Sequence, residues 1–137
     1  MVKTAQFELV APEELLLSEL VELAVVPGAE GDFGFMPGHS PFISTLRTGV
    51  ITVYEGDEVR KRLFVSGGVA EITPERCTVL ADEAVSIETA NRRDVENRVR
   101  ASQEMFDAAR EDEKDDAAEA LRISKALLAV LDTAGQA

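Results

Sequence analysis

The chain has 137 residues, a usual length for one folded domain with an appendage and too short for a multidomain assembly. Hydrophobic residues make up 45% of it and charged residues 29%, a balance typical of globular proteins. The formal net charge of −12 repels phosphate backbones and anionic lipid headgroups at long range, so we expect no nucleic-acid partner.

The residue types that build metal sites and disulfides are scarce. Cys77 is the one cysteine and His39 the one histidine, which excludes an internal disulfide and a Cys/His metal cluster, and we expect no metal and no cofactor. No apolar stretch approaches the roughly 18 residues that cross a bilayer, and the N-terminus lacks the apolar segment of a secretory signal. We therefore expect a chain that stays in the cytosol and meets a membrane only through a partner.

Residues 1–86 carry the alternation of short strands. Apolar residues such as Phe7 alternate with polar ones, and turn residues interrupt the pattern about every 8 to 12 positions, which predicts a β-sandwich domain. Gly56 and Pro74 mark the turns of two predicted hairpins. Cys77 then takes an ordinary strand position, where a free cysteine packs as a small hydrophobe.

Residues 87–137 carry the period of a helix instead. Two stripes follow spacings of four and three residues, and a charged connection at 111–116 separates them, so we expect an antiparallel two-helix hairpin. Asn91, followed three residues later by Asp94, is a suitable N-cap for the first helix. The stripes consist of Val95, Val99, Ser102, Phe106 and Ala109, and of Ala117, Leu121, Ser124, Leu128 and Leu131.

The predicted hairpin is acidic and only marginally stable. Its many alanines bury little area per residue, so the hydrophobic gain exceeds the cost of ordering the backbone by little, and we expect that the hairpin can detach. Residues 111–137 hold seven acidic and three basic side chains.

Residues 27–41 hold four glycines and three prolines. A phosphate-binding loop is disfavoured there, because Glu30 and Asp32 are acidic and the segment has no lysine or arginine. A hydrolase with Ser40 as nucleophile and His39 as base is disfavoured too, because adjacent side chains of an extended segment point apart. Two interpretations stay open: a rigid turn-rich loop with a hydrogen-bonded histidine, and a docking surface for another protein.

Four blocks of the sequence, in their order and spacing, resemble the epsilon subunit family of the F-type ATP synthase. The resemblance covers the whole chain, closely to about residue 88 and more loosely through the predicted helices. The blocks are GDFG at 31–34 with PGHSP at 37–41, Leu46 with GVI at 49–51, SGGVAEI at 66–72, and TVLADEA at 78–84.

The resemblance implies a fold and a mechanical role. The fold is a flattened β-sandwich of about ten strands followed by the helical hairpin. The role is that of a non-catalytic rotor subunit, whose sandwich packs against the gamma subunit and rests on the polar loops of the c ring, so that proton-driven rotation is coupled to ATP synthesis. The chain would then be a peripheral protein on the cytoplasmic face of a bacterial plasma membrane. The c-ring contacts implied are Glu30, Gly31, Asp32, Phe33, His39 and Ser40.

In many members of the same family the hairpin is also a brake that opens toward the catalytic beta and alpha subunits and impedes ATP hydrolysis. Such a brake needs two arrangements within a few kcal/mol of each other. Docking on an acidic segment requires basic side chains, and the acidic hairpin opposes it, so we expect weak inhibition. The regulatory residues implied are Val95, Val99, Phe106, Leu121, Arg122, Lys125 and Leu128.

Some members of the family also bind ATP on the folded hairpin, through an Ile/Leu-Asp-x-x-Arg-Ala motif and arginines of the second helix. At the matching positions this chain has Glu88 for the aspartate and Asn91 for the arginine, with Arg92 one position late. The candidate nucleotide contacts are thus Glu88, Arg92 and Arg122, and we expect no tight ATP binding.

Two rival hypotheses belong to other classes of protein. One is an autonomous cytosolic ligand-binding or adaptor module, which would function away from membranes. The other is an enzyme that uses His39 and Ser40, in which His39→Ala would abolish turnover. We expect that the chain is not an enzyme.

Overall fold

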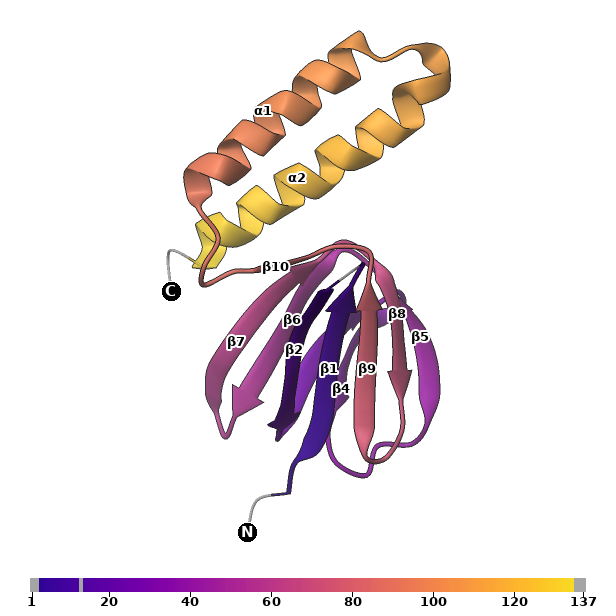
Figure 1. The fold of residues 1–137 in the computed structure, drawn as a ribbon, viewed down its shortest axis with the longest axis vertical. Helices are drawn as coiled ribbons and strands as arrows, with labels where there is room; N and C mark the ends of the chain where they lie inside the picture. The colour runs from indigo at the N-terminus through magenta and orange to yellow at the C-terminus, as the bar shows by residue number, and fades with distance from the viewer. Residues whose placement is uncertain (1–2, 13, 135–137) are drawn as a thin grey trace. The chain divides into compact units, whose positions relative to one another are not determined.

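The computed structural model describes residues 3–12 and 14–134, and the chain divides into two compact units, Met1–Glu88 and Thr89–Ala137. The first unit is built of strands and the second of helices (Figure 1). The predicted fold class, a sandwich of ten strands followed by two helices, is confirmed. Among the described residues, neither helix combines the length and the apolar character needed to cross a bilayer.

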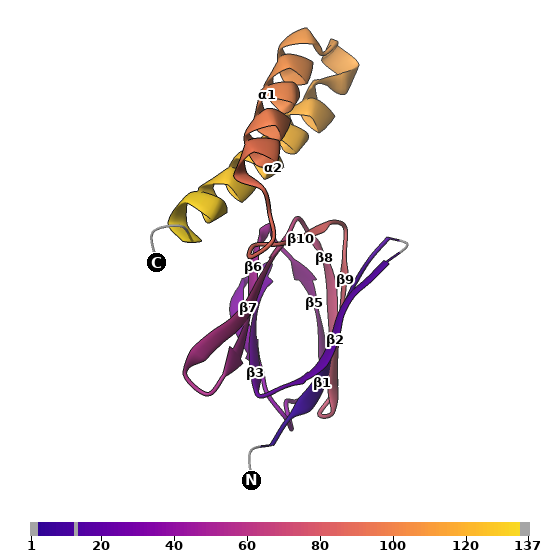
Figure 2. The same cartoon turned by 60° about the vertical axis from the view of Figure 1, so that its left-hand side comes forward.

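The ten strands form one continuous sheet that rolls into two facing layers (Figure 2). One layer holds β10, β7, β6 and β3, with β4 also paired to β3, and the other holds β5, β8, β9, β1 and β2. The strands are β1 (Ala5–Ala11), β2 (Glu14–Val21), β3 (Leu23–Gly28), β4 (Gly31–Phe35), β5 (Phe42–Leu46), β6 (Gly49–Glu55), β7 (Glu58–Val65), β8 (Gly68–Ile72), β9 (Arg76–Ala81) and β10 (Ala84–Ser86).

Strand β3 carries the sheet from one layer to the other. Its first residues, Leu23 to Val25, pair with β6, whereas its last residue, Gly28, pairs with Leu46 of β5. Strand β4 returns antiparallel along β3. This crossing places the β3–β4 turn beside the β5–β6 turn, at one end of the sandwich.

Inward-facing side chains fill the space between the layers, which accounts for the period of two in the sequence. On β1, Phe7 and Leu9 are buried while Gln6 and Glu8 between and beside them are partly exposed. Cys77 of β9 lies in the same core, as predicted. Its burial raises the pKa of the thiol to about 12, because the thiolate would lose its hydration there.

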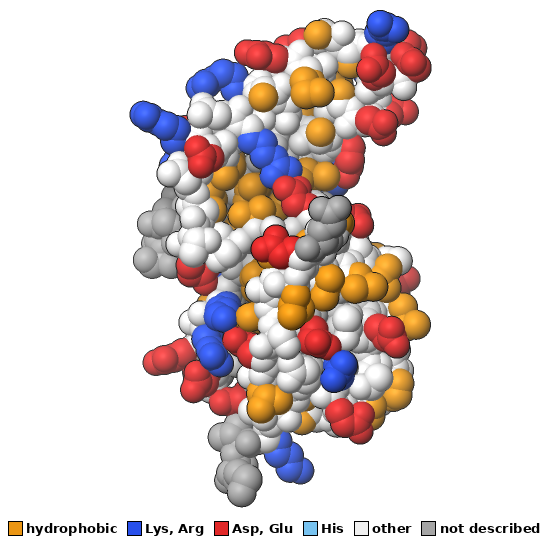
Figure 3. Space-filling model, in the orientation of Figure 1, with side chains coloured by type: hydrophobic (Ala, Val, Ile, Leu, Met, Phe, Trp, Pro, Cys, Tyr) orange, Lys and Arg blue, Asp and Glu red, His pale blue; other side chains and the backbone are white. Residues whose placement is uncertain are grey.

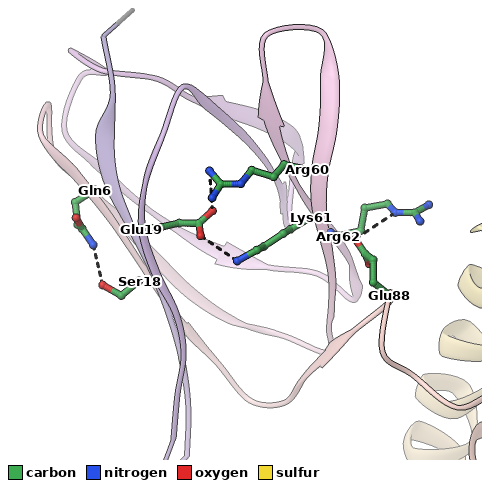
Figure 4. A network of polar contacts seen from close by, with 7 residues as sticks. All are labelled: Gln6, Ser18, Glu19, Arg60, Lys61, Arg62 and Glu88. Atoms are coloured by element: carbon green, nitrogen blue, oxygen red, sulfur yellow. Dashed lines mark hydrogen bonds and ion pairs between the residues drawn. The ribbon is translucent and has the colours of Figure 1, made fainter.

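Charged contacts join the two layers where β2 approaches β7 (Figure 4). Glu19 shares the inward side of β2 with the buried Leu17 and Val21. Its carboxylate accepts a hydrogen bond from Lys61 Nζ at 2.9 Å and lies 3.6 Å from Arg60 Nη1. Since β2 is the last strand of the sheet path, an inward-pointing charge there also discourages edge-to-edge pairing with other chains.

The second unit is a helical hairpin of α1 (Arg92–Ala108), a short 3-10 turn (Glu111–Glu113) and α2 (Lys114–Ala134). The predicted N-cap is confirmed, since Asn91 Oδ1 accepts a hydrogen bond from the Asp94 backbone amide at 3.1 Å. Lys114 ties the tip together: its ammonium donates to the Phe106 carbonyl at 2.8 Å and lies 4.4 Å from the centre of the Phe106 ring.

Two details of the hairpin differ from the sequence prediction. The charged segment 111–116 is not only a connection, because its last residues already form the first turn of α2, where acidic side chains favour the positive end of the helix dipole. In the second stripe, Leu127 is 1% exposed, while the predicted Leu128 is only half-buried. Adjacent leucines satisfy the spacing equally, and the tertiary packing buries the first.

Candidate functional site

The β3–β4 turn contains four of the residues implied as c-ring contacts. Gly31 adopts a φ of +139°, which residues with a side chain rarely take, and a Cβ on Gly28 would lie 2.7 Å from the Gly31 carbonyl oxygen. The two glycines therefore permit a tight reversal. Glu30 is exposed at the tip of this reversal, Asp32 is exposed just after it, and Phe33 is half-buried on β4.

Arg47, from the neighbouring β5–β6 turn, holds this reversal in place. Its guanidinium donates from Nη1 to the Gly28 carbonyl at 2.6 Å and from Nη2 to the Asp32 carboxylate. Backbone hydrogen bonds reinforce the contact, from Arg47 N to Pro27 O at 3.1 Å and from Ala29 N to Thr45 O at 2.8 Å. Nothing in the sequence pattern pointed to Arg47, because it lies 19 residues from Gly28 in the chain.

The other two implied contacts, His39 and Ser40, lie in the loop that follows β4. Because β4 runs from Gly31 to Phe35, a rise of about 13 Å, the loop and the β3–β4 turn lie toward opposite ends of this strand. The loop packs against the β8–β9 turn through a hydrogen bond from Gly38 N to Pro74 O at 2.8 Å. The structure therefore places Glu30, Gly31 and Asp32 toward one end of β4 and His39 and Ser40 beyond the other end, with Phe33 in the middle of the strand.

His39 is held by its own loop. Its Nδ1 lies 2.7 Å from the Ser40 backbone carbonyl, which can only accept, so Nδ1 carries the proton. The ring stacks on Phe42 at 5.4 Å between centroids, and Phe42 meets Phe33 edge to face at 5.0 Å. Nδ1 is thus bonded to the main-chain oxygen of Ser40 and not to the Ser40 hydroxyl that a hydrolase would activate.

A row of apolar side chains crosses the outer face of the second layer. Strand register aligns Val69 of β8 with Leu80 of β9, Leu80 with Val10 of β1, and Val10 with Leu15 of β2. Leu80 and Leu15 are 56% and 59% exposed, and Ile43 of β5 is 70% exposed on its strand. Figure 3 shows hydrophobic side chains on the face of the sandwich that carries β8 and β9.

This apolar row, defined as Val10, Leu15, Val69 and Leu80, was missed by the sequence analysis. On β9 the neighbours Val79 and Leu80 are both apolar although they face opposite sides of the sheet, and Val79 is buried. Such a break in the alternation was the available signal. Exposed large apolar side chains that line up across strands mark a contact surface for another protein.

In the hairpin, the implied regulatory residues divide by burial. Val95 and Leu121 are buried, and Val99, Phe106 and Leu128 are half-buried. Arg122 and Lys125 are exposed and line a shallow groove of about 260 Å³ together with Phe106, Ala118 and Leu121.

The candidate nucleotide contacts already have partners within the chain. The Glu88 carboxylate accepts a hydrogen bond from the Arg62 backbone amide at 2.9 Å. Arg92 pairs with Asp132, which lies ten residues and about 15 Å along α2 from Arg122. Two guanidinium groups so placed do not converge on one phosphate.

Arg122 itself pairs with Glu119, donating from Nε to the carboxylate at 3.0 Å. The hydrogen bond from Arg122 lowers the pKa of the Glu119 carboxyl. Half of the basic charge that the groove offers is therefore compensated within α2.

The β-sandwich domain of the ATP synthase Delta/Epsilon chain family matches residues 4–87. The ATP synthase epsilon chain of Rhodospirillum rubrum is 52% identical over 130 residues, which cover 94% of this chain and 97% of the relative. The epsilon chain of Paramagnetospirillum magneticum is 42% identical over 132 residues, covering 96% and 99%.

Two solved structures share the fold. A chain of the Euglena gracilis mitochondrial ATP synthase (OSCP/F1/c-ring, rotational state 1) aligns with a TM-score of 0.74 at 24% identity, over 93% of this chain and 81% of that one. A chain of the Tetrahymena thermophila mitochondrial ATP synthase central stalk/c-ring aligns with a TM-score of 0.62 at 12% identity, over 94% and 97%. At these sequence identities the two solved structures support the fold alone. The family match and the sequence relatives give the assignment: the chain belongs to the ATP synthase epsilon chain family and is a non-catalytic subunit.

Proposed function

We propose that the chain is a rotor subunit in the central stalk of an ATP synthase and couples c-ring rotation to ATP synthesis. The observation that carries this proposal is that the sandwich presents two different surfaces, an apolar row on one face and a rigid polar turn at one end. A passive adaptor that transmits torque must bind two partners at the same time. An apolar contact contributes most of the binding affinity, whereas a polar contact fixes the relative position of the two partners.

We assign the apolar row to the gamma subunit, because a permanent shaft contact calls for apolar burial. The β3–β4 turn, with Glu30 and Asp32, is assigned to the polar loops of the c ring. His39 and Ser40 lie beyond the other end of β4, beside the exposed Phe42. A partner with a flat surface that contacts the β3–β4 turn therefore does not contact these two residues as well. We therefore place their loop with the gamma contact.

The hairpin is proposed as a weak regulator of ATP hydrolysis that meets the catalytic beta and alpha subunits. The 3-10 turn and the first turn of α2 are rich in acids, and Arg122 is already paired with Glu119. Little net positive charge is left for an acidic docking segment. The complex would hold the chain peripherally at the cytoplasmic face of a bacterial plasma membrane.

The test compares two valine variants that differ in position only. Val69→Glu places a charge in the apolar row, and Val59→Glu places the same charge on β7, in the other layer, where the valine is similarly exposed. Membranes are prepared from cells that carry each variant, and the chain bound to the ATP synthase and the ATP-driven proton pumping are measured.

Val69→Glu should release the chain from the complex and lower proton pumping, while Val59→Glu should leave both as in wild type. The adaptor hypothesis predicts instead that even the wild-type chain does not co-purify with membrane ATPase activity. That outcome, or equal retention of the two variants, would refute the assignment.

A further inference from the structure

Arg47 arranges the charges of the β3–β4 turn, and this arrangement determines which carboxylate a partner meets. Asp32 is one of the implied c-ring contacts, but its carboxylate already accepts a hydrogen bond from Nη2 of Arg47. Among the described residues none pairs with Glu30, whose side chain is exposed at the tip. The turn therefore offers one free carboxylate beside one neutralised pair.

The contact is a clamp because it has two points of attachment. The same guanidinium that meets Asp32 donates to the Gly28 carbonyl at 2.6 Å, on the other side of the turn. Arginine presents its donors in a fixed planar fork, so both ends of the reversal are held in one relative position. A lysine carries the same charge as a point and does not bridge the two acceptors in this way.

We propose that Arg47 is the positioning residue of the c-ring contact, and that it makes Glu30 the carboxylate that selects a cationic side chain on the partner loop. This inference rests on the proposed function for the identity of the partner. The clamp itself is a property of the isolated sandwich. The partner chemistry it fits is an ammonium or guanidinium group on a polar loop, met at the tip of a preformed turn.

Preorganisation is what the clamp contributes. A turn with two glycines has many conformations in the absence of a constraint, and a partner that binds it must then order it. Arg47, together with the hydrogen bonds from Ala29 N and from its own backbone amide, removes that cost before the partner arrives.

Hydrogen exchange of the full-length chain tests the clamp. In Arg47→Ala, the amides of Ala29 and of residue 47 should exchange about five-fold faster than in wild type, since a charge-assisted but exposed contact is lost. Arg47→Lys should resemble Arg47→Ala. Arg60→Ala is the control, because Arg60 is as exposed as Arg47 (44% and 45% of the side chain) and pairs with an acid elsewhere in the sandwich, and it should leave both amides unchanged.

Proton pumping by the complete ATP synthase in membrane vesicles tests the partner. Glu30→Gln should lower pumping per ATP hydrolysed more than Asp32→Asn, and Arg47→Lys should lower it as much as Arg47→Ala. The clamp is refuted if Arg47→Lys behaves as wild type, because the charge alone would then suffice. The role of Glu30 is refuted if Asp32→Asn has the larger effect.

The two levels of the proposal fail in different ways. If the sandwich does not contact the c ring, none of the turn variants will change pumping, yet the exchange difference between wild type and Arg47→Ala will persist. If only the role of Arg47 is wrong, Glu30→Gln will still lower pumping while Arg47→Ala changes neither exchange nor pumping.

Discussion

The Glu19 carboxylate of β2 accepts a hydrogen bond from the Lys61 ammonium of β7 at 2.9 Å, although the two residues are 42 positions apart. They belong to different layers, so this contact joins the layers at a side of the sandwich that the sheet path leaves open (Figure 4). Only 16% of the Glu19 side chain is exposed, against 42% of the Lys61 side chain, so removing Lys61 leaves a poorly hydrated carboxylate.

We expect Lys61→Ala to lower the free energy of unfolding by about 1 to 2 kcal/mol, because the Glu19 carboxylate, which is mostly buried, loses its hydrogen-bonded counter-charge. Urea denaturation of the full chain measures the change. Arg60→Ala should cost less than about 0.5 kcal/mol, since Lys61 still satisfies Glu19. Equal costs for the two variants would show that the 3.6 Å contact of Arg60 matters as much as the hydrogen bond of Lys61.

Because Cys77 is buried, we expect the folded chain to lose stability at alkaline pH. Its pKa is about 12 in the folded chain against an ordinary value of 9.0, so between these values the unfolded chain has lost a proton that the folded chain keeps. The contribution of the protonated Cys77 thiol to the free energy of unfolding is complete below pH 9 and falls as the pH rises toward 12. Unfolding free energies measured across this range should fall more steeply for wild type than for Cys77→Ala.

The thiol reactivity of Cys77 gives an independent check of the same burial. A thiol-specific reagent at neutral pH should label the native chain slowly and the urea-unfolded chain rapidly, because only the thiolate reacts and the buried thiol stays protonated. Rapid labelling of the native chain would contradict the position of Cys77 in the core.

Deleting residues 89–137 should raise ATP hydrolysis by the assembled enzyme only slightly. The cut falls between the two compact units and leaves the hydrogen bond from Ile87 N to Arg62 O intact, so the sandwich keeps its last contacts. The reason for a small effect is electrostatic, because the second helix has only three bases, of which Arg122 is already paired with Glu119, with which to dock on an acidic segment. A many-fold rise in hydrolysis would show that the hairpin is a strong brake.

Calorimetric titration of the full chain with ATP should give no saturable heat at sub-millimolar nucleotide. Arg92 of α1 is paired with Asp132 near the C-terminal end of α2, and Arg122 of α2 is paired with Glu119, so binding would require both ion pairs to break. Arg122→Ala serves as the control and should give the same featureless trace. A micromolar isotherm that this variant abolishes would overturn the expectation.

Much of the fold could be predicted from the sequence, because it depends on local patterns. The period of two through residue 86 and the helical period after it follow from which side chains must face a core, and the Asn91 cap follows from a side chain reaching an amide three residues on. The order and spacing of short blocks were sufficient to identify the family, which the relatives confirm.

The tertiary structure alone decided which distant residues meet. Sheet register aligned the apolar row across four strands, and β4 set Glu30 and His39 at opposite ends, although nine positions of sequence had suggested one site. The clamp of Arg47 on Asp32 and the contact of Glu19 with Lys61 likewise depend on how β3 crosses between layers and where the sheet path ends. Periodicity states which face of a strand is buried, whereas the neighbours of that face depend on topology, which no local pattern encodes.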